Sequence, residues 1–253
     1  KFLAQSQIGT RKIVRQHVMD GMVKVNGQIV YEPASDINEK ADIIEYADNV
    51  IELKEKVYYM FNKPAGCITA RKDEREKTVF DYFDDLNMEG IFHIGRLDKD
   101  TEGLLLFTND GDFNNKLMSP KYHVDKKYFF IALGSISEYD KKTLENGVYI
   151  GKDEEITKPA RLENVKRGLY NELEEELNLR KYYDINSDFH SQQIVYGYLT
   201  ISEGRKHQVK RMLKSAGCYV IYLKRISIGA LELDDSLAMG EYRELSDEEI
   251  KLF

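Results

Sequence analysis

The sequence predicts a protein that mixes α-helices with β-strands, arranged as a small N-terminal module and a larger second part. Residues 10–31 combine an amphipathic helical stretch with a tight hairpin. From residue 56 onward, apolar strand-like runs alternate with helical stretches. The chain has 253 residues, enough for one or two domains with a substantial core.

The N-terminal module begins with a short helical stretch and continues as a helix followed by a hairpin. Thr10 is a suitable N-cap, the apolar residues of 13–18 share one helical face, and Gly21 ends the helix. Asn26-Gly27 between alternating residues is typical of a two-residue hairpin turn. We expect the polar segment 33–48 to add the last strand or two of the module.

The second part contains several predicted strands, which are rich in apolar, β-branched and aromatic residues. They lie near residues 57–61, 91–94, 104–108, 128–133, 196–202 and 218–223. Helical patterns occupy residues 79–86, 113–118 and 206–216. Segment 167–194 contains an acidic run, and we expect it to be a solvated insertion.

The overall charge conceals two basic segments. The net charge is −7, from 37 basic and 44 acidic residues, which by itself disfavours a nucleic-acid partner. However, residues 1–33 hold five basic against two acidic residues, and residues 203–225 hold seven against one. The basic helix of the module could be a solvated face or an RNA-binding surface. These two basic patches are therefore compatible with a polyanionic partner.

Several functional classes are excluded by composition. The two cysteines, Cys67 and Cys218, rule out a disulfide framework and a multi-cysteine zinc site. Residues 98–103 resemble the start of a calcium loop, but Asn109 stands where the bidentate Glu belongs. No apolar run is long enough to span a bilayer, and the first residues do not form a signal peptide. We expect a cytoplasmic protein without a structural metal.

Three positions could carry chemistry, although each also has an ordinary structural interpretation. Asp98 follows one short strand and precedes another, a loop position where catalytic groups concentrate, but it could be a surface turn. The basic helical segment 203–212 could hold the Lys210 ammonium beside a carboxylate, or be only a solvated face. Tyr128 opens a strand and could equally be a core tyrosine.

Together these segments resemble the RsuA-type rRNA pseudouridine synthases. Residues 95–111, GRLDKDTEGLLLFTNDG, are similar to the signature of that family. The family's other motifs are matched by NKPAG at 62–66, KKY at 126–128, EGRKHQVKRM at 203–212 and GEYR at 240–243. Residues 1–46 resemble the small S-four-like RNA-binding module, named after a ribosomal protein. The resemblance covers nearly the whole chain except 167–194.

The resemblance implies an α+β fold. It divides the chain into an S-four-like RNA-binding module at 1–48, a linker at 49–55 and a catalytic domain at 56–253. The module is expected to be a helix-helix-hairpin unit. The catalytic domain is expected to have a mixed, largely antiparallel central sheet flanked by helices.

The resemblance also implies the reaction, in which uridine becomes pseudouridine. The N1–C1′ bond breaks, the uracil rotates, and C5 joins C1′. Asp98 would be the essential carboxylate, which either attacks C1′ or assists proton loss from C2′. Lys210 would favour its ionised form. Tyr128 would stack on the flipped uracil and could move the C5 proton.

The remaining expectations concern RNA. Arg96 is a candidate to fill the space that the flipped base leaves. Other predicted RNA contacts are Lys63, Arg205, His207 and Arg211 in the catalytic domain and Arg11, Lys12, Arg15 and Lys24 in the module. We expect no cofactor and no metal, and a monomeric protein.

The expected partner is ribosomal RNA, as 16S rRNA or a small-subunit assembly intermediate. His207-Gln208-Val209-Lys210 is closer to family members that modify uridine 516 of 16S rRNA than to those acting on 23S rRNA. Two alternatives remain: a 23S rRNA pseudouridine synthase of the same family, and a non-catalytic RNA-binding protein of ribosome assembly.

Overall fold

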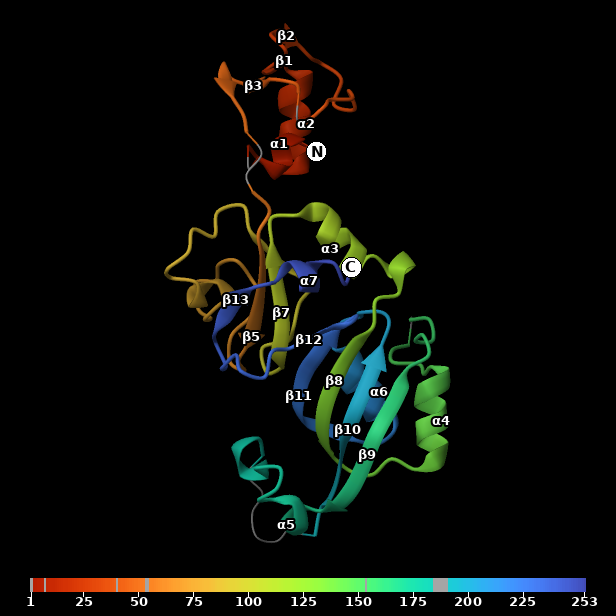
Figure 1. The fold of residues 1–253 in the computed structure, drawn as a ribbon. Coiled ribbons are helices and arrows are strands. Elements are labelled where there is room, and N and C mark those ends of the chain that lie inside the picture. The colour runs from red at the N-terminus through yellow and green to blue at the C-terminus, as the bar shows by residue number, and fades with distance from the viewer. Residues whose placement is uncertain (1, 7, 40, 53–54, 153, 184–190) are drawn as a thin grey trace.

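The N-terminal module consists of two helices and a small antiparallel sheet (Figure 1). The computed structural model describes the chain except for residues 1, 7, 40, 53–54, 153 and 184–190. In the module, the strand order is β2-β1-β3-β4. Its elements are α1 (Phe2–Gln5), α2 (Arg11–Met19), β1 (Val23–Val25), β2 (Gln28–Ile29), β3 (Ile44–Tyr46) and β4 (Asn49–Val50).

The predicted caps and turns of the module are present. The Thr10 side chain accepts a hydrogen bond from the Ile13 N–H at the start of α2. Asn26 and Gly27 have φ values of 51° and 78°, as a two-residue hairpin turn with positive φ at both positions requires. β4 lies inside the predicted linker 49–55, so the module extends beyond residue 48. The linker also includes residues 53–54, which lie outside the described residues.

The catalytic part is built on a large, largely antiparallel sheet. The strand order is β13-β5-β7-β11-β8-β10-β9, with β6 beside β7 and β12 beside β11. Only the β7–β11 pair is parallel among the described strand pairs. The strands are β5 (Tyr58–Lys63), β6 (Phe92–Ile94), β7 (Glu102–Thr108), β8 (Lys126–Leu133), β9 (Arg161–Leu169), β10 (Gln193–Ile201), β11 (Tyr219–Ile228), β12 (Leu231–Glu232) and β13 (Tyr242–Glu244).

Short helices flank this sheet. They are α3 (Gly111–Met118), α4 (Glu138–Asn146), α5 (Tyr170–Leu173), α6 (Gln208–Ser215) and α7 (Asp247–Ile250), with 3₁₀ turns at Val79–Tyr82, Pro120–Tyr122 and Leu179–Lys181. α6 packs against β11, and α4 packs against β9 (Figure 1). The expected α+β architecture with a mixed, largely antiparallel sheet is confirmed. No helix of the described residues is long and apolar enough to cross a membrane.

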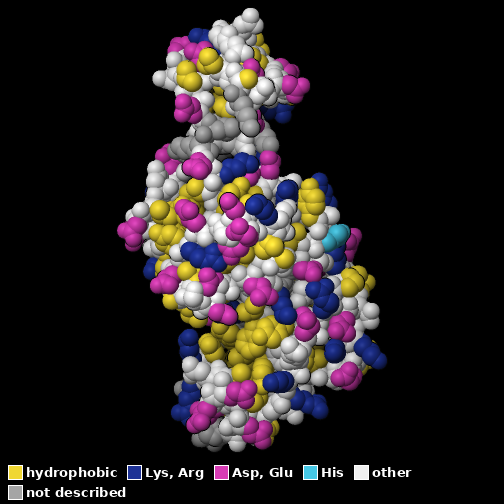
Figure 2. Space-filling view, viewed as in Figure 1, with side chains coloured by type: hydrophobic (Ala, Val, Ile, Leu, Met, Phe, Trp, Pro, Cys, Tyr) yellow, Lys and Arg dark blue, Asp and Glu magenta, His cyan; other side chains and the backbone are white. Residues whose placement is uncertain are grey.

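The side chains of β8 separate two cores on opposite faces of the sheet. Phe130 and Ala132 belong to the core beneath α6, which also contains Met212 and Leu213. Ile131, between them in sequence, belongs to a second core on the other face. Figure 2 shows hydrophobic side chains gathered over this second face, where β8, β10 and β11 lie in Figure 1.

The expectation of a solvated insertion is only partly right for the described part of 167–194, where Glu172, Glu175 and Glu176 are exposed but some apolar side chains are not. Tyr170 is 1% exposed and Leu179 is fully buried, and both join the second core of the sheet. The Tyr182 ring lies 4.2 Å from the Tyr222 ring, measured between centroids. Besides its glutamates, the segment therefore contains apolar side chains that cover part of the sheet. Residues 184–190 of this segment lie outside the described residues.

Candidate active site

Asp98 lies on the loop between β6 and β7, and this loop is tied to the segment that follows β5. The Thr69 hydroxyl donates to the Leu97 carbonyl at 2.7 Å and accepts the Leu97 N–H at 3.1 Å. The Gly66 N–H donates to the Lys99 carbonyl at 2.8 Å. Asp98 is therefore presented by backbone that is fixed on both sides.

The strongest tie is the buried ammonium group of Lys63. Lys63 has 0% exposure, and its Nζ donates to the carbonyls of Pro64, Asp98 and Thr101 at 3.0, 3.1 and 2.9 Å. A fourth carbonyl, that of Lys99, lies 3.4 Å away. Burial lowers the pKa of Lys63, and nearby carboxylates oppose that shift. The prediction that Lys63 contacts RNA is wrong, because its donors are enclosed and already bonded.

The structure brings the Lys210 ammonium close to the Asp98 carboxylate. Lys210 Nζ lies 3.8 Å from Asp98 Oδ2 and closer, at 2.5 Å, to Asp100 Oδ1. His207 Nε2 lies 3.5 Å from Asp98 Oδ1. Burial opposes ionisation of Asp100, but the hydrogen bond and charge of Lys210 leave its pKa below the ordinary value. Lys210 is thus shared between two carboxylates, whereas the sequence analysis paired it with Asp98 alone.

α6 holds Lys210 in place because its opposite side is buried. Val209, Met212 and Leu213 pack into the core beneath the sheet, as their helical spacing predicts. The Gln208 side chain donates to the Glu203 carboxylate at 2.8 Å and so closes the preceding loop. The side chain at position 210 is consequently carried on a rigid element.

A cavity of about 420 Å³ joins these groups to Tyr128. Asp98, Lys210 and His207 line it together with Tyr128, which projects from β8 and is 8% exposed. Cavities of this size accept small organic groups. Its further lining includes two cations and apolar side chains from the β6–β7 loop, β10, α6 and β11: Lys126, Arg225, Leu97, Ile201, Val209 and Leu223.

Arg96 and the two arginines around α6 have different surroundings. Arg96 is exposed and lines the same cavity, which suits the predicted contact with RNA. Arg205 instead donates to the carbonyls of Glu155 and Ile156 at 2.5 and 2.9 Å.

Arg211 is similarly committed within the chain. Its guanidinium donates to the Ile150 carbonyl, with Nε at 2.9 Å, and to the Glu154 carboxylate. Both arginines therefore hold the segment before β9 against the start of α6. Arg205 also lines the Asp98 cavity, and contact of Arg205 and Arg211 with RNA stays a prediction.

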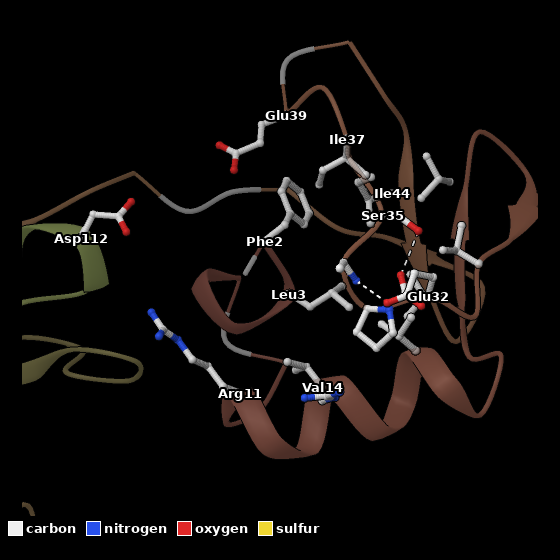
Figure 3. A pocket seen from close by; sticks show the side chains of 17 residues that line it. Phe2, Leu3, Arg11, Val14, Glu32, Ser35, Ile37, Glu39, Ile44 and Asp112 are labelled. Atoms are coloured by element: carbon white, nitrogen blue, oxygen red, sulfur yellow. Dashed lines mark hydrogen bonds between the residues drawn. The ribbon is translucent and has the colours of Figure 1, made fainter. Parts of the chain in front are cut away.

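The basic residues of the module remain mostly accessible. Arg11, Lys12 and Arg15 are exposed on α2, whereas Lys24 donates to Asp48 at 2.6 Å. Figure 3 shows a cavity of about 690 Å³ in the module, with Arg11 extending toward Asp112 of α3. Most of its lining is the apolar core of the module, so it offers fewer chemical groups than the Asp98 cavity despite its larger volume. Within the described ranges, no three or more His, Cys, Asp or Glu residues are grouped as a metal would require.

Comparison with known proteins agrees with this geometry. The profile of the RNA pseudouridylate synthase family matches residues 57–215. An uncharacterized RNA pseudouridine synthase of Bacillus subtilis, YtzG, is 40% identical over 100% of this chain and 96% of that protein. A crystal structure of a pseudouridylate synthase is 34% identical, covers 100% of this chain and 97% of its own, and has a TM-score of 0.64.

Relatives with named ribosomal targets fall into two groups. The ribosomal small subunit pseudouridine synthase A of Haemophilus influenzae is 34% identical over 99% of this chain and 97% of that protein. The ribosomal large subunit pseudouridine synthase B of Bacillus subtilis is 36% identical over 99% of this chain and 93% of that protein. The fold and site thus define an RNA-modifying enzyme. The chain belongs to the RNA pseudouridylate synthase family.

Sequence reasoning missed several groups of the site. One feature of the sequence could have indicated the burial of Lys63: it lies two residues after the apolar strand-like run Val57 to Phe61. Lys126 and Arg225 had a similar signal, because each is a cation within or beside a strand-like run. Nothing in the local sequence indicated that Asp100 lies close to Lys210, since these residues are 110 positions apart.

We predict that Lys63→Met lowers both stability and activity. The methionine fills a similar volume but leaves buried carbonyls without a donor, which should reduce the free energy of unfolding by about 2 kcal/mol or more. Displacement of the Asp98 loop should reduce turnover by about 100-fold. The exposed Lys72→Met is the matched control and should change neither quantity. Weaker RNA binding with unchanged stability would restore the RNA-contact interpretation of Lys63.

Proposed function

We propose that this protein converts uridine 516 of 16S rRNA to pseudouridine. One observation carries the proposed chemistry: the Asp98 carboxylate lies 3.8 Å from the Lys210 ammonium in a cavity that Tyr128 also lines. A structured RNA hides its bases, so the target uridine must be flipped out of its stack. Tyr128 then offers a ring on which the uracil stacks.

Asp98 begins the reaction as an ionised carboxylate. The Lys210 ammonium favours that form through its positive charge, and His207 can hydrogen-bond the other carboxylate oxygen. Two routes break the N1–C1′ bond. In one, Asp98 bonds to C1′, and in the other it removes the C2′ proton.

The second half of the reaction rejoins the same two fragments. The uracil rotates, C5 bonds to C1′, and the proton on C5 must leave. The Tyr128 hydroxyl is the group we propose for moving that proton, because Tyr128 would lie against the stacked ring. The product differs from the substrate only in its connectivity, so the proposed cycle consumes no co-reactant.

The choice of 16S rRNA rests on two supports. The segment His207-Gln208-Val209-Lys210 resembles small-subunit enzymes of the family, and relatives named small subunit synthase A are 32–34% identical to this chain. The second candidate is a site in 23S rRNA, because the large subunit synthase B of Bacillus subtilis is 36% identical. The cavity with its acid and cation disfavours a purely non-catalytic RNA-binding role.

The N-terminal module would hold the rRNA while the catalytic domain acts. Arg11, Lys12 and Arg15 form an exposed basic face of α2 that suits phosphate contacts. Lys24 contributes less because its ammonium is paired with Asp48. We also propose that the protein acts in the cytoplasm and as a monomer.

Asp98→Asn should abolish catalysis without removing RNA binding. Asparagine is nearly isosteric but cannot supply an ionised oxygen, so tritium release from 5-tritiated uridine in a 16S fragment should fall by about a thousandfold or more. Asp100→Asn is the matched control. Asp100 is mostly exposed, and its ion pair with Lys210 should affect turnover by no more than about fivefold. Equal tritium release by Asp98→Asn and the parent would contradict the role of Asp98.

The position of the product tests the choice of target. Carbodiimide treatment and reverse transcription of rRNA should show a stop at 16S position 516 in cells with the parent gene. The stop should be absent in cells that lack the gene and in cells that carry Asp98→Asn. A stop that moves to 23S rRNA would favour the second candidate, and no gene-dependent stop would overturn the proposed function.

Arg11→Glu combined with Arg15→Glu should weaken RNA binding and reduce its salt dependence. Each lost phosphate contact should reduce the slope of log K against log salt by about 0.7–0.9 in magnitude, because fewer counterions are released. Lys141→Glu with Lys142→Glu on α4 makes the same charge change elsewhere and serves as the control. Parent-like affinity and slope in the α2 variant would show that this face does not bind RNA.

A further inference from the structure

The inner part of the catalytic cavity contains two buried cations that the reaction scheme above does not use. Lys126 is 6% exposed and Arg225 is 2% exposed, and both line the cavity. Arg225 stands opposite Tyr128 in the antiparallel register of β8 and β11. Side chains at such directly paired positions project from the same face of a sheet. The guanidinium is thus a neighbour of the ring proposed to stack on uracil.

One end of the Arg225 guanidinium is fixed, and the other has unused donors. Nε donates to the Leu104 carbonyl at 2.7 Å, whereas Nη2 is buried and has no hydrogen-bond partner in the described part of the chain. The Thr101 hydroxyl, which lines the same cavity, is also buried and unpartnered there. Unsatisfied buried polar groups destabilise a fold and require an explanation. Because both residues line the cavity, a ligand bound at this end is the candidate partner for both groups.

The position of Arg225 inside the cavity indicates which part of the RNA would bind there. Phosphates carry full charge and remain near solvent, where the exposed Arg96 and His207 provide donors at the cavity rim. Arg225 is instead enclosed beside Tyr128, where a stacked base would present its edge. This end of the cavity is enclosed, with Lys126 only 6% exposed, and burial together with the charge of Arg225 lowers the pKa of Lys126 to about 8. Uracil presents two carbonyl oxygens there, O2 and O4, both hydrogen-bond acceptors.

We propose that Arg225 donates from Nη2 to a carbonyl oxygen of the flipped uracil and stabilises the negative charge that forms on it. This rests on the proposed function. When N1–C1′ breaks, its electron pair stays with the uracil and spreads over N1 and O2. C1′ either gains a bond to an Asp98 oxygen or becomes doubly bonded to C2′ as the C2′ proton leaves. A buried cation stabilises such an anion much better than water-exposed donors do.

The symmetry of uracil allows one donor to serve both halves of the reaction. A half-turn about the axis through N3 and C6 exchanges N1 with C5, and the same turn exchanges O2 with O4. Arg225 can therefore bind O2 while N1–C1′ breaks and O4 once C5 faces C1′. The fixed Nε bond to Leu104 keeps the donor in place while the ring turns. Arg225 would then be a catalytic residue that also selects for a ring with two carbonyls.

The test combines protein variants with single-atom changes in the RNA. The substrate is a 16S fragment with uridine, 2-thiouridine or 4-thiouridine at the target, because sulfur accepts hydrogen bonds weakly. In the parent, each sulfur should lower the product-forming rate by about tenfold or more. Arg225→Gln should lower the rate on uridine by about 100-fold and reduce each sulfur effect to less than about threefold. The neighbouring Lys224→Gln faces the other side of the sheet and should behave like the parent.

A merely structural role predicts a different pattern. In that case Arg225→Gln slows all substrates by one common factor and keeps the parent's sulfur effects, which would overturn the proposal. Arg225→Met, which has no hydrogen-bond donor on its side chain, carries the same test if the glutamine variant does not fold, and a slower enzyme with parent-like sulfur effects would again overturn the proposal. A parent enzyme that forms no pseudouridine in any rRNA would instead refute the proposed function itself.

Discussion

A buried ammonium group holds the loop on which the proposed catalysis depends. Lys63 lies at the end of β5 and donates to backbone carbonyls of the loop that carries Asp98. Burying a charge is unfavourable unless it is well hydrogen-bonded, and here the carbonyls around Nζ provide those bonds. Because the contacts go to backbone atoms, they fix the loop while leaving the Asp98 carboxylate free for chemistry.

The opposite wall of the cavity is positioned by other contacts. α6 is anchored by its apolar residues, and Arg205 and Arg211 connect its start to carbonyls of the segment before β9. The 3.8 Å approach of Lys210 to Asp98 thus joins two separately supported elements. Catalytic groups held by such supporting contacts keep the geometry that a reaction requires. The sharing of Lys210 between Asp98 and Asp100 also links the two walls.

Much of this arrangement could be predicted from local signals. The cap at Thr10, the Asn26-Gly27 turn and the apolar face of α6 each depend on neighbouring residues, so the sequence identified them. Proximity to Asp98 was expected for Lys210 from the family resemblance. The internal contacts of residues whose partners are distant in sequence were missed. Lys63, Arg205 and Arg211 looked like free cations, but carbonyls 35 to 61 positions away bind them.

The expectation for the acidic segment 167–194 was incomplete for another reason. Its glutamates dominate the composition, whereas the burial of Tyr170 and Leu179 depends on the sheet face that lies beneath them. No local pattern shows that β8, β10 and β11 leave that face to be covered. Arg225 was also overlooked, because its place beside a strand-like run is a weak signal and its partners come from neighbouring strands of the sheet.

Amide hydrogen exchange tests most directly whether Lys63 holds the Asp98 loop. The Gly66 and Thr101 N–H groups bond to the Lys99 and Asp98 carbonyls, which the ammonium also contacts. In Lys63→Met, these two amides should exchange at least about tenfold faster, while amides in the β8–β10 ladder keep their parent rates. Unchanged exchange at Gly66 and Thr101 would show that the loop keeps its structure without the ammonium, and would contradict the account.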